Sequence, residues 1–206
     1  CVEAVESGAG WYASHAWNPA FFAGTATFAY ELAHQRDWQV PDAVVLPVGH
    51  GTLFLGAYRG FRALVEAGWT DSVPRLLGVQ AAGYDPIARR VESKRGGSSG
   101  RERRGNDGGG GAGTDEATND LADGIRIREP VRGEEIRAAV EATDGDCIAV
   151  DATATGRELD ALHAHGFYTE PTCAVAPAGL REYRERGVLD GDDDVVVPLT
   201  GSGLKG

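Results

Sequence analysis

Methionine is absent from this chain of 206 residues, and lysine and cysteine are scarce. Of the 20 Lys and Arg residues, only Lys94 and Lys205 are lysines, and the net charge is −11. This acidic, arginine-rich composition disfavours non-specific binding to nucleic acid and resembles that of halophile-like proteins from a salt-rich cytoplasm. The three cysteines, Cys1, Cys147 and Cys173, form no CxxC pair, which argues against both a disulfide framework and a zinc site.

Long apolar runs are also missing, so the sequence predicts no membrane span, and no signal peptide opens it. A cytoplasmic location is the expectation that follows. The chain does not begin with methionine, and residues 2–10 resemble the end of a helix, so we expect a piece of a longer protein. Residues 1–40 are then a remnant that leads from a missing N-terminal part, and residues 41–206 form one α/β domain.

Residues 44–53, VVLPVGHGTL, are the centre of that predicted domain. An apolar, β-branched run leads into a turn with two glycines, and an amphipathic segment follows, which indicates strand, glycine loop and helix. The free N–H groups at such a helix start can bind an anion, with phosphate the default ligand. A plain tight turn that binds nothing also uses glycine, so the spacing alone leaves both interpretations open.

Further apolar runs at residues 75–80, 147–150 and 195–199 predict three more buried strands. Helices between them, residues 133–143 included, favour a parallel sheet in a three-layer α/β architecture. The last strand leads to a second glycine corner, which begins with Thr200. If both corners leave the same edge of the sheet, they can hold one ligand from two sides.

The composition changes between residues 92 and 118, where glycine, serine and charged residues replace apolar ones. We interpret this stretch as a disordered insertion outside the site. Aromatic residues are dense between Trp11 and Phe22, and we expect the core to cover them, with a partner subunit as the other source of cover. We expect residues 24–27 to cap the next helix, and glycines 56 and 60 to pack on the sheet. No histidine or carboxylate pattern predicts a metal site.

Several short motifs, taken in order, resemble threonine synthase, among the pyridoxal-phosphate enzymes of the tryptophan synthase β-like fold. They are Asn18-Pro19 with Gly24 and Thr27, the stretch 41–52, residues 78–81, Asp123-Gly124-Ile125, Glu170-Pro171-Thr172 and residues 197–205. The resemblance covers nearly all of the chain outside the glycine-rich insertion. It implies the C-terminal portion of such an enzyme, with pyridoxal phosphate as cofactor.

The same resemblance assigns roles to residues. It implies that the loop of Gly49, His50, Gly51, Thr52 and Leu53 holds the cofactor phosphate and that the Thr200 hydroxyl meets the pyridine nitrogen. The implied reaction converts O-phosphohomoserine and water to threonine and phosphate. The chain departs from the family at His50, at Ala23 and Ala26, and at Ser202, which leaves the substrate open.

The resemblance also implies that the Schiff-base lysine lies in the missing N-terminal part, so no catalytic residue is assigned here and this piece alone is expected to be inactive. The expected partner is a small amino-acid substrate, with a homodimer as a possible assembly. Three alternatives stay open: a related eliminating enzyme such as threonine dehydratase or cysteine synthase, a noncatalytic binding or scaffold protein, and a nucleotide-binding α/β domain.

Overall fold

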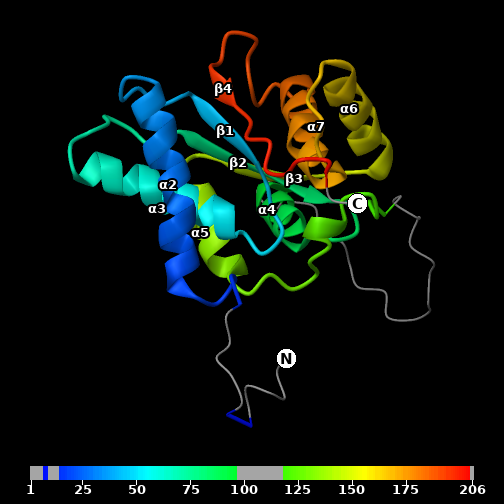
Figure 1. The fold of residues 1–206 in the computed structure, drawn as a ribbon, viewed down its shortest axis with the longest axis horizontal. Helices are drawn as coiled ribbons and strands as arrows, with labels where there is room; N and C mark the ends of the chain where they lie inside the picture. The colour runs from blue at the N-terminus through cyan, green and yellow to red at the C-terminus, as the bar shows by residue number, and fades with distance from the viewer. Residues whose placement is uncertain (1–6, 9–13, 97–117, 205–206) are drawn as a thin grey trace.

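The computed structural model describes residues 7–8, 14–96 and 118–204 and has an α/β fold (Figure 1). Four parallel strands form one sheet in the order β3-β2-β1-β4. Within the described residues the elements, in chain order, are α2 (Pro19–Gln35), β1 (Ala43–Pro47), α3 (Thr52–Glu66), β2 (Arg75–Ala81), α4 (Pro86–Gly96), η1 (Asp123–Ile125), α5 (Gly133–Ala142), β3 (Asp146–Val150), α6 (Ala152–Ala164), α7 (Pro171–Glu185) and β4 (Val195–Val196).

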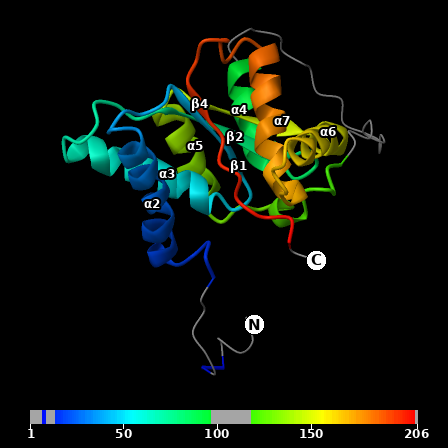
Figure 2. The same cartoon turned by 45° about the horizontal axis from the view of Figure 1, so that its top comes forward.

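Two apolar cores lie on opposite faces of the sheet because successive side chains of a strand point to opposite sides. Val44 and Leu46 of β1 face a core shared with α2, α3, α4 and α5. Ala43 and Val45 face the other core, where α7 packs. Figure 2 shows α7 and α6 on the side of the sheet away from α2, α3 and α5. The predicted three-layer arrangement with a parallel sheet is confirmed.

The helix before β1 begins earlier than the sequence suggested. Asn18 is its N-cap, with the side-chain oxygen accepting from the Ala20 N–H at 2.9 Å, and Pro19 occupies the first helical position. Both features are favourable at a helix start, so the expectation that residues 24–27 cap this helix was wrong. Gly24 and Thr25 instead lie inside α2.

Glycines 56 and 60 of α3 pack on α2, so their predicted packing on the sheet was also wrong. A Cβ atom at Gly56 would lie 2.0 Å from Thr25 Oγ1, and one at Gly60 would lie 2.6 Å from the Ala26 carbonyl oxygen. The two helices therefore approach each other at a crossing that only small residues permit.

Three further expectations need correction. The aromatic cluster is only partly buried, because Phe22 enters the core while Trp17 and Phe21 remain 56% and 44% exposed. The fourth strand is short and ends at Val196. Helix α4 extends to Gly96, so residues 92–96 are helical although the sequence placed them in the insertion. Residues 97–117 of that insertion lie outside the described residues, and its disorder stays a prediction.

None of the described helices combines the length and the apolar character needed to cross a bilayer.

Candidate cofactor site

The five residues predicted to hold a phosphate form the junction between β1 and α3. Gly51 is the N-cap of α3, and the first helical hydrogen bond joins the Leu55 N–H to the Gly51 carbonyl at 2.9 Å. The N–H groups of residues 52–54 therefore have no acceptor within the helix, as at any helix start. Together with the helix dipole they favour an anion at this point.

The surroundings of this loop require glycine at position 51 and leave little room for a side chain at position 49. Gly51 has φ +78°, in the left-handed region that glycine tolerates, and a Cβ there would lie 2.3 Å from Ile136 Cδ1. Gly49 is tighter than usual against Ile125, with 3.2 Å from its would-be Cβ to Cγ2. The main chain of the loop thus lies against the buried side chains of Ile125 in η1 and Ile136 in α5. Because glycine has no side chain, nothing from these two residues covers the N–H groups at the helix start.

Two buried polar atoms of the loop have no hydrogen-bond partner among the described residues. They are the Thr52 hydroxyl oxygen and Nδ1 of His50. Leaving a buried polar atom unpaired costs about 1–3 kcal/mol. Of the six such side-chain atoms among the described residues, these two are close neighbours in sequence at a helix start. Adjacent to the free N–H groups of α3, they fit a phosphate that accepts hydrogen bonds from both side chains. The groups of the loop therefore fit the phosphate of pyridoxal phosphate.

His50 has a second histidine beside it. The centroids of the His15 and His50 rings lie 5.7 Å apart in an edge-to-face arrangement. Burial lowers the pKa of His50, and the positive charge that His15 can carry lowers it further. His50 is consequently neutral at pH 7, when one ring nitrogen donates and the other accepts.

Thr200, the second predicted contact, follows the strand next to β1. Strands β1 and β4 are parallel neighbours, with Ala43 opposite Val195 and Val44 opposite Val196. The segments after the two strands therefore leave the same edge of the sheet, which is the geometry that a shared ligand needs. Thr200 is exposed and lines a hollow of about 420 Å³ with residues 166–169 and 199–202.

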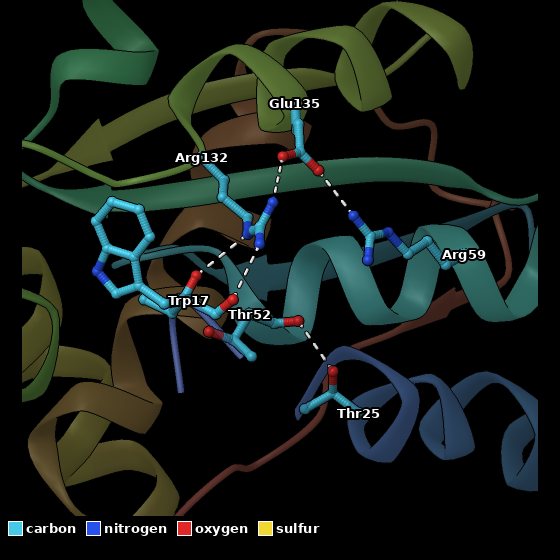
Figure 3. Close-up of polar contacts among 7 residues, drawn as sticks. Trp17, Thr25, Thr52, Arg59, Arg132 and Glu135 are labelled. Atoms are coloured by element: carbon cyan, nitrogen blue, oxygen red, sulfur yellow. Dashed lines mark hydrogen bonds and ion pairs between the residues drawn. The ribbon is translucent and has the colours of Figure 1, made fainter. Parts of the chain in front are cut away.

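The sequence did not reveal the side chains that hold the turn before α2 against this loop (Figure 3). Arg132 donates to the Ala16 and Trp17 carbonyl oxygens at 3.1 and 3.2 Å and to Glu135 at 2.6 Å. Arg59 of α3 reaches the second oxygen of Glu135 at 2.7 Å. This network fixes the turn that carries His15. No local pattern marks Arg132, because the turn that it holds lies far from it in the chain.

Gln80 is a second residue that sequence reasoning missed. It is fully buried on β2, and its side-chain oxygen accepts from the N–H groups of Ile87 and Ala88 at 2.8 and 3.1 Å. Its amide group donates to the Val48 carbonyl at 3.4 Å. Gln80 therefore connects the start of α4 with the residue just before the glycine loop. A lone glutamine inside an apolar strand was the available signal.

Lys94 and the glycine loop lie at opposite edges of the sheet. Lys94 is on the last turn of α4 and forms an ion pair with Glu141 near the end of α5. Helices that return from parallel strands end at the opposite edge of the sheet from the one at which those strands end. No cluster of three or more metal-ligating side chains occurs within the described ranges.

Comparison with known proteins gives the family. A family profile described as "Pyridoxal-phosphate dependent enzyme" matches residues 1–201. The chain belongs to this family. Pyridoxal phosphate, the cofactor expected from the resemblance, is thereby confirmed.

Relatives similar to this chain include threonine synthases. The chain is 32% identical to that of Methanosarcina acetivorans and 31% identical to that of Methanocaldococcus jannaschii, with 94% of this chain aligned in each case. It spans 45% of the length of each of these relatives. A solved threonine deaminase from T.th. aligns with 90% of this chain and 59% of its own, at 25% identity and a TM-score of 0.64.

Proposed function

We propose that this chain is the cofactor-binding C-terminal portion of a threonine synthase, which converts O-phosphohomoserine and water to threonine and phosphate. The observation that carries the proposal is the pair of unpartnered buried atoms, Thr52 Oγ1 and His50 Nδ1, beside the free N–H groups of α3. The similarity to the threonine synthases of Methanosarcina acetivorans and Methanocaldococcus jannaschii supports this substrate.

Each residue of the site has a role in this proposal. The N–H groups of residues 52–54, the Thr52 hydroxyl and Nδ1 of His50, in the tautomer protonated there, donate to the cofactor phosphate. Thr200 donates to the pyridine nitrogen. Because a hydroxyl is neutral, it leaves this nitrogen mostly unprotonated, which suits elimination and replacement chemistry better than transamination. When bound, pyridoxal phosphate supplies the electron sink that permits loss of a proton and of the leaving group.

The proposal places the lysine that bonds to the cofactor outside this sequence. Lys94 is engaged with Glu141 near the other end of α4. Such a lysine is needed to hold the cofactor aldehyde and to transfer protons. Borohydride reduction of the complete protein, followed by peptide mass spectrometry, should find the cofactor attached to a lysine beyond residues 1–206. Specific attachment at Lys94 would contradict this part of the proposal.

The decisive test is an assay of the complete reading frame for phosphate release from O-phosphohomoserine. Turnover with threonine formation supports the proposal. Activity on threonine without phosphate release would favour the second candidate, a threonine deaminase, which the similarity to the solved T.th. enzyme supports. Thermal protection by nucleotides but not by pyridoxal phosphate would contradict both.

A further inference from the structure

Cys173 is the buried side chain against which the Thr200 corner packs. It lies on the first turn of α7 and is completely buried, whereas Thr200 is exposed. Its sulfur lies 3.5 Å from the Thr200 hydroxyl oxygen. The Gly201 N–H donates to the same sulfur at 2.8 Å, and the Gly201 carbonyl oxygen lies 3.1 Å from it. One atom thus contacts both Thr200 and the peptide groups of the next residue.

The rest of this corner is held by main-chain bonds. The Glu170 N–H donates to the Gly201 carbonyl at 3.3 Å, and the Gly203 N–H donates to the Tyr168 carbonyl at 3.0 Å. Thr169 and Ser202 form an antiparallel bridge. These bonds fix the course of the main chain on both sides of Gly201, but none of them touches the Thr200 hydroxyl. The polar contact of that hydroxyl within the described part of the chain is the Cys173 thiol.

We infer that Cys173 is a positioning residue for Thr200, which sets the direction in which the Thr200 hydroxyl donates. This inference rests on the proposed function, in which that hydroxyl meets the pyridine nitrogen. A thiol has one proton, which can go to the Gly201 carbonyl or to the Thr200 oxygen. When the Thr200 oxygen accepts it, the Thr200 proton is directed away from the sulfur and is available to the cofactor.

Sulfur suits this position because of its size. The longer C–S bond and larger radius let one buried atom contact the Thr200 hydroxyl and both peptide groups of Gly201. A serine hydroxyl at the same place retains a donor but is shorter, so it should keep the contact in part. Alanine removes the donor and leaves the Thr200 hydroxyl free to rotate.

The experiment compares Cys173→Ala, Cys173→Ser and Thr200→Ala in the complete protein loaded with pyridoxal phosphate. Cys147→Ala is the matched control, because Cys147 is the other described cysteine, is also buried, and lies on β3. The readouts are kcat, KM and the pH dependence of the absorption band of the bound cofactor. Thermal unfolding of each variant without cofactor reports on folding.

We expect Cys173→Ala to lower kcat about fivefold, as the loss of one hydrogen bond would, with KM changed less than about twofold. The pH midpoint of the absorption band should shift by about half a unit. Cys173→Ser should restore most of the wild-type kcat and pH midpoint. Cys147→Ala should change neither quantity. In the Thr200→Ala background, Cys173→Ala should have no further effect on the band, because coupled residues are not additive.

Cys173→Ala that matches the wild type in kcat and absorption would overturn the inference and leave the proposed function standing. An effect of Cys173→Ala that persists in full in the Thr200→Ala background would overturn it as well, since the thiol would then act elsewhere. Failure of the Cys173→Ser variant to recover function, despite normal unfolding, would do the same. A complete wild-type protein that binds no pyridoxal phosphate would overturn the proposed function and this inference together.

Discussion

The hydroxyl of Thr25 on α2 lies 3.0 Å from the main-chain carbonyl oxygen of Thr52, the first residue of α3. Figure 3 shows the two residues facing each other across the helix crossing. This contact connects α2 directly to the start of the helix that we propose binds the phosphate. It exists because Gly56, one turn further along α3, leaves room for the Thr25 side chain.

Substitution of that glycine should open the crossing. We expect Gly56→Ala to lower the free energy of unfolding by about 2–3 kcal/mol, because the new Cβ would overlap Thr25. Gly24→Ala is the matched control, since Gly24 lies within α2 and a Cβ there meets nothing within 4 Å. That control should raise the same free energy by about 0.5–1 kcal/mol. Urea unfolding measures both, and equal effects would show that the crossing is not tight.

Gln80 should be essential for the position of the loop. Gln80→Leu removes the partner of two N–H groups at the start of α4 and of the Val48 carbonyl. We therefore expect the free energy of unfolding, measured with urea, to fall by about 3 kcal/mol. Affinity for pyridoxal phosphate should fall as well, because Val48 precedes the glycine loop. Gln39→Leu, at an exposed position, serves as control and should change both quantities little. A stable Gln80→Leu variant would refute the connecting role.

Thr52→Val should affect the free and the loaded protein in opposite directions. Without cofactor, the substitution removes an unpaired buried oxygen and should leave the free energy of unfolding unchanged or raise it by up to about 1 kcal/mol. With cofactor, it removes a hydrogen bond to a charged group and should weaken pyridoxal-phosphate binding about tenfold. Urea unfolding measures the stability without cofactor, and calorimetric titration measures the affinity for pyridoxal phosphate. Thr153→Val, on the exposed side of α6, should change neither.

The pH dependence of stability should report the environment of His50. Its pKa in the folded protein lies below the ordinary 6.5, so near and below pH 6.5 the unfolded chain binds more protons than the folded one. Stability without cofactor should therefore rise with pH through this window and level off above it. His50→Asn should flatten this part of the profile relative to His34→Asn, a histidine on α2 away from the loop. If His50→Asn leaves the slope of stability against pH unchanged, His50 is not the group responsible for it.

Much of the architecture followed from local patterns in the sequence. The apolar runs before Gly49 and at residues 75–80 have one face for each core, and the helix between them favours the parallel pairing that the structure has. The glycine loop was recognisable because its residues are contiguous and their types match what an anion site needs. For the same reason, helix α5 was predicted within one residue of its end.

The predictions that were wrong concern side chains whose neighbours are distant in sequence. Trp17 and Phe21 are as apolar as Phe22, yet only Phe22 lies under the two guanidinium groups of Arg59 and Arg132, each 4.7 Å from its ring centre. The glycines of α3 correctly indicated close packing, but the sheet was the wrong partner. The crossing with α2 became visible only in the tertiary structure.

The sequence by itself determined the order of elements, the parallel sheet and the two glycine corners, because hydrophobic period and turn chemistry are local properties. The tertiary structure decided that β4 lies beside β1, so that both corners leave one edge. It also decided which polar atoms of the loop are buried without a partner and which thiol supports Thr200. Those facts arise from contacts between residues up to about 150 positions apart, which no local pattern encodes.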